Sequence, residues 1–172
     1  MNAISAIWSR PNGRFLIRVV AFLGVFLLFY REEAIGRLLA PLSLATARAA
    51  AGVLEFSGME VVRSLSELRH PSGFAYEVYY RCTGLLPVVI LTICTLAYPA
   101  PLKPKAVGLV IGIPLLLSLN LARLAHLFYI GVHSPDLFDL AHSILWEAML
   151  IGATLGFFWR WSSRVPSQAP EN

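Results

Sequence analysis

The 172-residue chain is 57% hydrophobic and only 14% charged, and its mean hydropathy is +0.66. Soluble domains carry about a quarter charged residues, so this composition excludes an ordinary soluble protein and indicates an integral membrane protein. The net charge of +4 does not indicate nucleic-acid binding, because the basic residues fall at the ends of apolar runs, as the positive-inside rule predicts. We expect one membrane-embedded domain over residues 1–172.

The first apolar run covers about Phe15–Tyr30 and follows or overlaps three arginines, Arg10, Arg14 and Arg18. This pattern is similar to a secretory signal peptide. However, Phe29-Tyr30-Arg31-Glu32-Glu33 stands where a cleavage site of small residues would lie. We therefore expect an uncleaved membrane-spanning anchor.

The next apolar stretch, Ile35–Phe56, is rich in alanine and carries charged residues and a proline, namely Arg37, Pro41, Arg48 and Glu55. These features favour an amphipathic helix that lies on the membrane surface or packs against the bundle. If this stretch crossed the membrane, Lys103 and Lys105 would move to the outside, against the positive-inside rule. We therefore place the whole segment 31–84 at the outer face.

The stretch Ser57–Arg81 has a different composition. Met59–Leu65 and Phe74–Tyr80 are typical of β-strands, and His70-Pro71-Ser72-Gly73 between them is a turn signal. The pattern predicts a small β-hairpin on the outer face that leads the chain to Cys82.

Three further spans are predicted, at about Leu85–Tyr98, Ala106–Ile130 and Ala141–Trp161. Thr83-Gly84 allows a turn before the first of them, and Pro99 and Pro101 end it. Pro114 is expected to kink the second. Ser134-Pro135-Asp136 has the pattern of a helix cap followed by proline in the first turn, so the last helix is expected to begin before the hydrocarbon and to enter it near His142.

The predicted fold is therefore an all-α polytopic membrane protein. It has four transmembrane helices, an amphipathic outer-face helix and a small β-hairpin. Both termini are expected in the cytoplasm, because that arrangement puts the following basic residues on one side: Arg10, Arg14, Lys103, Lys105, Arg160 and Arg164.

Arg123 lies within the third apolar run, where an ionisable side chain is costly and marks a functional site by default. It follows Lys105 by 18 positions, about 27 Å along a helix, and so reaches the outer part of a hydrocarbon core about 30 Å thick. Cys82 is expected at the outer end of the second span and His142 at the outer end of the fourth. The topology thus predicts that all three share one depth.

Together these side chains indicate cysteine-based peptide chemistry. A thiol attacks as the thiolate, an imidazole transfers protons, and a guanidinium stabilises an oxyanion. Asn120, three positions before Arg123, could orient it or line the site, and Asp139 could orient His142.

Alternatives remain open at this point. Arg123 could instead form a structural ion pair with Glu147, and His126 competes with His142 for the acid/base role. Cys94 lies in an apolar run and is expected to be a buried small hydrophobe. No His/Cys spacing matches a tetrahedral metal site, so we expect neither a metal nor another cofactor.

Several segments occur together in a specific order and spacing: Pro71–Val78, Cys82-Thr83-Gly84, Tyr98–Pro101, Asn120–Arg123, Leu127–Gly131 and His142. In these segments the chain resembles the exosortase/archaeosortase family of membrane-embedded cysteine transpeptidase-like proteases. The resemblance covers roughly Ile35 to Trp161. It implies Cys82 as nucleophile, Arg123 as oxyanion stabiliser and His142 as acid/base.

Leu127–Gly131 and Phe138–His142 are most similar to exosortase H, which implies substrates with an IPTL-type rather than a PEP-type sorting signal. The expected function is cleavage of C-terminal sorting signals of secreted proteins, through a thioester on Cys82, at the outer face of the bacterial inner membrane. The expected partners are secreted proteins with a sorting motif, a transmembrane helix and a basic tail, together with membrane lipid and an envelope amine acceptor. No nucleic acid is expected.

Two other functions compete with this one. A small four-span transporter or channel would use Arg123 and Glu147 as a polar path and would tolerate loss of the thiol. A membrane scaffold without chemistry would tolerate loss of all three reactive side chains.

Overall fold

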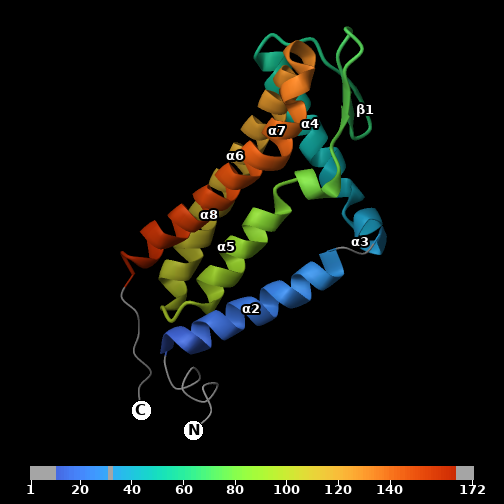
Figure 1. Cartoon of the computed structure of the whole chain (residues 1–172). Helices are drawn as coiled ribbons and strands as arrows, with labels where there is room; N and C mark the ends of the chain where they lie inside the picture. The colour runs from blue at the N-terminus through green and yellow to red at the C-terminus, as the bar shows by residue number, and fades with distance from the viewer. Residues whose placement is uncertain (1–10, 31–32, 166–172) are drawn as a thin grey trace.

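The structure, a computed structural model, describes residues 11–30 and 33–165. It is a mostly helical protein with a small sheet at one end (Figure 1). Arg10 and Arg31-Glu32, which enter the predictions of orientation and of the uncleaved anchor, lie outside the described residues. The elements are α2 (Pro11–Tyr30), α3 (Glu33–Leu38), α4 (Ala40–Phe56), β1 (Val62–Ser64), β2 (Glu67–Arg69), β3 (Ala75–Glu77), η1 (Tyr80–Cys82), α5 (Leu85–Ala97), α6 (Leu102–His133), η2 (Pro135–Leu137), α7 (Phe138–Leu140), η3 (Ala141–Leu145) and α8 (Trp146–Ser162).

Each of the four predicted spans coincides with a helix. Two are long and apolar enough to cross a membrane: α6, and the helical stretch Pro135–Ser162 that ends with α8. The apolar part of α2, Phe15–Phe26, and α5 are shorter. The helices are therefore confirmed, whereas the count of four spans stays a prediction.

The predicted beginnings and ends of these helices are largely found. α5 ends at Ala97, before Pro99, and the last helical stretch begins at Pro135 without a hydrogen bond from the Ser134 side chain. α6 runs through Pro114 as one helix of 32 residues. Long helices tolerate proline when neighbouring helices support the backbone, which is the case for this central helix.

Two glycines allow α6 to approach its neighbours closely. A Cβ on Gly108 would lie 2.5 Å from Nε1 of Trp161, and one on Gly112 would lie 2.5 Å from Cδ2 of Leu91. Helices in membranes pack through small residues in this way. The position of α6 against α5 and α8 therefore depends on these two glycines.

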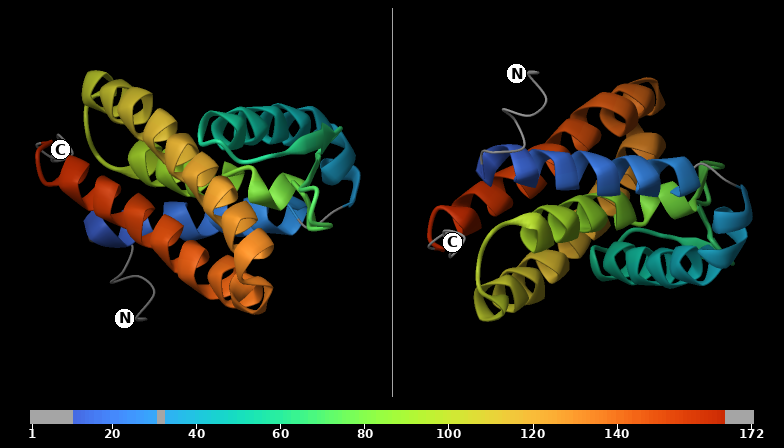
Figure 2. Two further views of the ribbon diagram at one scale, coloured as in Figure 1. Left: turned by 90° about the horizontal axis from the view of Figure 1, so that it is seen from above. Right: turned by 90° about the horizontal axis from the view of Figure 1, so that it is seen from below.

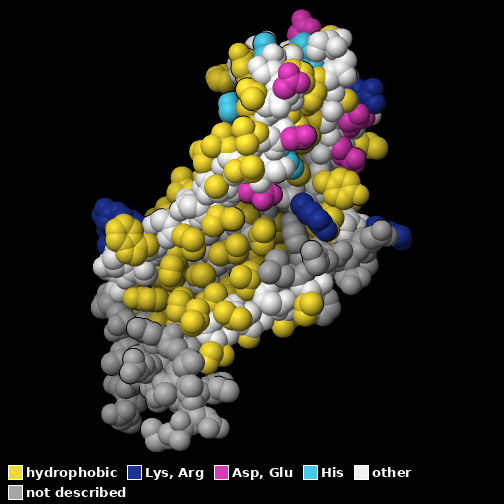
Figure 3. Space-filling view, viewed as in Figure 1, with side chains coloured by type: hydrophobic (Ala, Val, Ile, Leu, Met, Phe, Trp, Pro, Cys, Tyr) yellow, Lys and Arg dark blue, Asp and Glu magenta, His cyan; other side chains and the backbone are white. Residues whose placement is uncertain are grey.

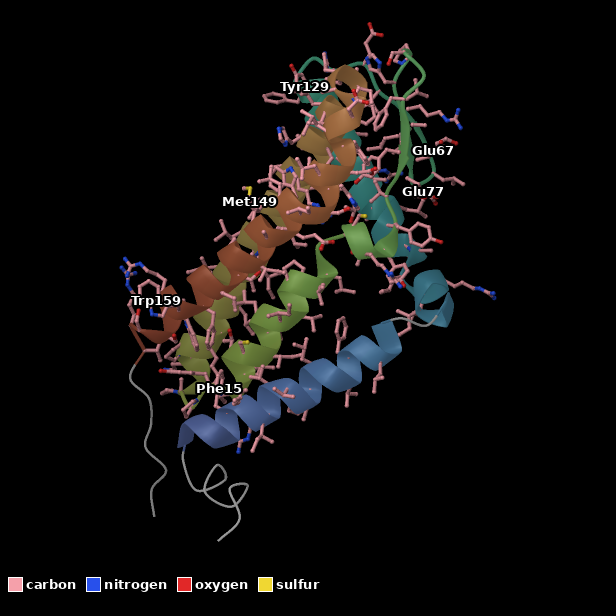
Figure 4. All side chains as sticks on the ribbon, viewed as in Figure 1. Phe15, Glu67, Glu77, Tyr129, Met149 and Trp159 are labelled. Carbon is pink, nitrogen blue, oxygen red and sulfur yellow. The ribbon has the colours of Figure 1, made fainter. Side chains whose placement is uncertain are left out.

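Aromatic side chains join three chain segments at one end of the molecule. Phe15 of α2 stacks on Phe158 of α8 with 6.0 Å between ring centroids, and Tyr98, just after α5, contacts Trp161 at 5.5 Å. The indole Nε1 of Trp161 donates to the carbonyl of Pro104 (3.0 Å). The start of α2, the α5–α6 connection and the end of α8 therefore lie together (Figure 4). This agrees with the prediction that Lys103, Lys105, Arg160 and Arg164 lie on one side.

The α4 helix packs against the C-terminal half of α6, at the opposite end (Figure 2). Its buried residues recur at intervals of three, four or one and form one face: Ser43, Ala47, Ala50, Ala51 and Leu54. These are mostly small side chains, so the two helix backbones can come close. This arrangement is consistent with the prediction that Ile35–Phe56 forms a helix packed against the bundle.

The predicted two-stranded hairpin is wrong in detail, because the segment forms a three-stranded antiparallel sheet in the order β1-β2-β3. The turn at residues 70–73 is present, between β2 and β3, with the amide of Gly73 donating to the carbonyl of His70 (3.0 Å). The middle strand, Glu67–Arg69, was missed because three residues with one apolar side chain carry no measurable alternation.

Charged side chains gather at the end of the molecule formed by the sheet, α4 and α7, and an apolar surface covers the body next to it (Figure 3). Large exposed apolar residues lie on several helices of this body, among them Leu16, Leu96, Val110, Ile151 and Leu155. Exposed apolar surface on this scale is expected of a protein that faces lipid rather than water.

Candidate active site

The sheet and η1 place Cys82 immediately before α5. The amide of Cys82 donates to the carbonyl of Tyr79 (2.8 Å), and the buried hydroxyl of Thr83 donates to the carbonyl of Tyr80 (2.6 Å). Gly84 then adopts φ +79°, a left-handed conformation that favours glycine. The Cys82-Thr83-Gly84 sequence thus forms a tight turn that fixes the direction of the thiol.

Asn120 on α6 holds this turn from the other side. Its Nδ2 donates to the carbonyl of Cys82 (2.9 Å), and a Cβ on Gly84 would lie only 3.0 Å from the Asn120 side chain. Asn120 is fully buried. Its amide therefore bonds to Cys82 and not to Arg123, which it was considered to orient.

The structure brings Cys82 and His142 together, although 60 positions separate them in sequence. The Cys82 Sγ and His142 Nε2 atoms are 3.9 Å apart. The His142 ring also stacks on Phe138 with 5.8 Å between centroids and 8° between planes. A sulfur–nitrogen distance of this size allows direct proton transfer after a small movement, as is usual in a site without substrate.

His142 lies in a π-helical segment, η3, between α7 and α8. Such segments add one residue to a turn, rotate the following side chains and occur frequently at functional sites. Sequence analysis did not predict it, because no residue pattern distinguishes a single π-turn from the surrounding α-helix.

Arg123 is buried on α6, with 5% of its surface exposed. Its charge acts on both Cys82 and His142. Its Nε atom is buried and has no hydrogen-bond partner among the described residues. No ion pair joins Arg123 to Glu147, whose side chain is exposed, so the structural ion pair considered as an alternative is not formed.

The two remaining candidates are less closely engaged. Asp139 is exposed and makes no hydrogen bond to His142, although its charge acts on the ring. His126 accepts a hydrogen bond at Nδ1 from the indole of Trp146 (3.0 Å). His142 is therefore the imidazole that faces the thiol, and His126 is occupied by a neighbour on α8.

The electrostatics of the thiol have two opposing parts. Burial raises the pKa of the Cys82 thiol above its usual value, and the positive charge of Arg123 lowers it. Burial is the larger effect, so the resting group is a thiol that needs a base to become a nucleophile. His142, whose Nε2 lies 3.9 Å from the sulfur, is the imidazole that can act as this base after a small movement.

Tyr76 is a polar residue of the site that sequence analysis missed. It is buried on β3, its ring contacts Phe138 at 6.1 Å, and its hydroxyl has no hydrogen-bond partner among the described residues. The alternation of exposed, buried and exposed residues along β3 points its side chain inward. That alternation is the signal that could have identified it, but three residues are too few to read it from sequence.

No group of three or more His, Cys, Asp or Glu side chains that could hold a metal ion occurs in the part of the chain that the structure describes. The polar groups near Cys82 include an imidazole, a guanidinium, an amide and a phenol, and the charge of the Glu147 carboxylate also acts on the thiol. This set is suited to proton transfer and to binding a carbonyl oxygen.

The chain was compared with protein families, with curated proteins and with solved structures. The family model described as transmembrane exosortase matches residues 3–160, most of the chain. Neither the curated proteins nor the solved structures include a significant match.

Proposed function

We propose that the chain cleaves C-terminal sorting signals of secreted proteins with Cys82 as its nucleophile. The chain belongs to the transmembrane exosortase family. The family consists of membrane-embedded cysteine peptidases or transpeptidases that act on such signals. The observation that carries the specific proposal is the 3.9 Å approach of Cys82 Sγ to His142 Nε2, beside a buried guanidinium.

In the first half of the reaction, His142 accepts the thiol proton and the Cys82 sulfur attacks the scissile carbonyl carbon. The carbon–sulfur bond forms while the π-electron pair of the carbonyl moves to its oxygen. Arg123 stabilises this oxyanion, and its buried Nε is a free donor for that purpose. The carbonyl then re-forms, the carbon–nitrogen bond breaks, and the leaving amine takes the proton from His142.

In the second half, water or an amine of the envelope attacks the thioester. His142 removes a proton from the attacking group, and the sulfur leaves as thiolate. Water gives hydrolysis and an amine gives transpeptidation, through the same tetrahedral geometry. Asn120 keeps the Cys82 turn in place through both halves, and Glu147 and Asp139 place negative charge near the imidazole.

The orientation follows from the charge distribution of the two ends. Lys103, Lys105, Arg160 and Arg164 lie at the end opposite the site, and the positive-inside rule assigns that end to the cytoplasm. The site then opens at the outer face of the bacterial inner membrane, with α2, α5, α6 and α8 as its four spans. The similarity to exosortase H supports an IPTL-type signal as the substrate motif.

Co-expression with candidate substrates tests this function. Secreted proteins with a C-terminal motif, a transmembrane helix and a basic tail should be shortened in cells with the natural chain, and Cys82→Ser should abolish the shortening. Cys94→Ala is the matched control, because that buried thiol lies within α5 away from the site and its variant should process normally. Processing by Cys82→Ser at the natural rate would contradict the proposal.

No specific observation favours a transporter, a channel or a scaffold. A polar path would need Arg123 and Glu147 to face each other, and the two side chains make no ion pair. A scaffold would not require a thiol, an imidazole and an unpaired buried guanidinium donor at one point.

A further inference from the structure

Three buried polar atoms lack a hydrogen-bond partner among the described residues: the Tyr76 hydroxyl, Asn120 Oδ1 and Arg123 Nε. Buried polar atoms without partners are rare in folded proteins, and each calls for an explanation. All three belong to side chains that contact Cys82, pack in the cluster that it joins or act on it by charge. Asn120 bonds to the Cys82 carbonyl, and the charges of Cys82 and Arg123 both act on Tyr76.

Of these three atoms, two can donate to a substrate oxygen and one cannot. Nε of Arg123 is a donor, and so is the Tyr76 hydroxyl. The Oδ1 atom of Asn120 only accepts, because the amide nitrogen is already identified by its bond to the Cys82 carbonyl. A carbonyl oxygen that becomes negative beside Cys82 therefore has two unoccupied donors near it.

The place of Tyr76 in the fold connects it to the site rather than to the outer surface. It belongs to the buried cluster that Cys82 and Phe138 pack against. Phe138 contacts the Tyr76 ring at 6.1 Å and the His142 ring at 5.8 Å, so one phenylalanine holds both the phenol and the imidazole in position. Burial also raises the pKa of Tyr76, which keeps its hydroxyl protonated and able to donate.

We propose that Tyr76 is a catalytic residue, whose hydroxyl donates a hydrogen bond, alongside Arg123, to the oxyanion that forms when Cys82 attacks the scissile carbonyl. The ligand of this pair is the peptide carbonyl oxygen of the sorting signal, and the proton of the phenol stays on the phenol throughout. The inference rests on the proposed function, since it assigns a second donor to the same reaction. It also explains why a tyrosine hydroxyl is buried without a partner.

Tyr76→Phe tests the inference, because it removes one oxygen atom and keeps the ring that contacts Phe138. Loss of one oxyanion donor lowers kcat by about 10²–10³-fold in other enzymes. We expect a fall of that size in the processing rate, with little change in KM. Alkylation of Cys82 by iodoacetamide forms no oxyanion and should proceed at nearly the natural rate.

Tyr80→Phe is the matched control. Tyr80 is as buried as Tyr76, but its hydroxyl accepts a hydrogen bond from Nε of Arg81 (3.1 Å). This variant should process substrate at close to the natural rate. Natural chain and Cys82→Ser are measured in the same assay, so that a failure of the proposed function, seen as processing that does not depend on Cys82, is distinct from a failure of the inference.

The outcomes separate as follows. Slow processing with normal membrane abundance and normal alkylation supports the inference. Processing by Tyr76→Phe at the natural rate overturns it, and so does an equal loss of processing and alkylation, which would indicate a packing role.

Should Tyr76→Phe fail to accumulate, 3-fluorotyrosine at position 76 retains the ring and hydroxyl and makes the phenol more acidic. A changed rate of processing, at a pH where the phenol stays protonated, then supports a donor at the oxyanion, and an unchanged rate overturns it.

Discussion

Arg123 combines features that are costly unless a ligand offsets them. The guanidinium is buried within α6, and its Nε has no partner among the described residues. Leaving such a donor unpaired costs on the order of 1–3 kcal/mol, or more for a charged group. A substrate oxygen that accepts from Nε would recover this cost only when it is bound, and most fully when it carries negative charge. This is the behaviour required of a group that stabilises a transition state.

Two substitutions of Arg123 separate its charge from its geometry. Arg123 lowers the pKa of the Cys82 thiol against the effect of burial. In Arg123→Gln the thiol pKa should therefore rise, and the pH profile of iodoacetamide alkylation should shift to higher pH. Arg123→Lys keeps the charge and should leave that profile nearly unchanged, yet it should lose most processing, because an ammonium cannot reproduce the planar fork. Full processing by Arg123→Lys would assign the residue a purely electrostatic role.

The two histidines near the site give a second prediction. His142 faces the thiol, whereas His126 accepts from Trp146. Loss of a general acid/base lowers rates by about 10²–10⁴-fold, so His142→Ala should be almost inactive at normal membrane abundance and should alkylate more slowly. His126→Ala should retain substantial activity. An active His142→Ala beside an inactive His126→Ala would move the acid/base role to α6.

The main candidates at the site were predictable from sequence because they depend on depth. Helix rise and charge bias put Cys82, Arg123 and His142 at one level before any contact was known. Depth does not predict the direction in which a side chain points around the helix axis. The pairing of His126 with Trp146 and the exposure of Glu147 depend on which way each helix faces, and the π-helical turn at residues 141–145 alters that facing locally.

At the scale of elements, predictability follows length. The four apolar runs are long enough to show a helical composition, and a helix is found at each. The strands have three residues each, and β2 was missed for that reason. Tyr76 was missed for the same reason, since its inward direction is set by pairing with Leu68 on β2 and not by its neighbours in sequence.

The turn between Cys82 and α5 gives a prediction at this scale. In Gly84→Ala a side chain would be added at φ +79°, 3.0 Å from Asn120. The left-handed conformation alone costs a non-glycine residue roughly 1–2 kcal/mol, which corresponds to a loss of about 2–8 °C in the midpoint of thermal inactivation. Processing should fall further, because Cys82 moves with the turn.

Gly52→Ala is the control for this substitution. Gly52 lies within α4, and an added Cβ would have nothing within 4 Å. Alanine is favoured over glycine in a helix by about 1 kcal/mol, so this variant should be at least as stable as the natural chain. Equal effects of the two substitutions would show that the turn does not require glycine.

At the scale of the whole molecule, the chain has two distinct ends. Aromatic contacts join the start of α2, the α5–α6 connection and the end of α8 at one end, while the sheet and α4 lie toward the other (Figure 1). An apolar surface lies between them (Figure 3). An apolar body between two ends that carry charged side chains is the division expected of a membrane protein.

Cysteine accessibility tests the orientation of these ends. A single cysteine introduced at Glu67, on β2, should react with a membrane-impermeant reagent in intact cells. One at Lys103, at the start of α6, should react only after permeabilisation. Labelling at Lys103 in intact cells would reverse the orientation and put the site on the cytoplasmic side.

The central claim is that Cys82 carries the substrate covalently, and the direct measurement is mass spectrometry of the acid-quenched reaction. The peptide that contains Cys82 should gain the mass of the N-terminal cleavage product. Neutral hydroxylamine should release that product, because it attacks thioesters, and Cys82→Ser should show no such thioester. Cleavage of the sorting signal without an adduct on Cys82, at a rate unaffected by Cys82→Ser, would contradict the account.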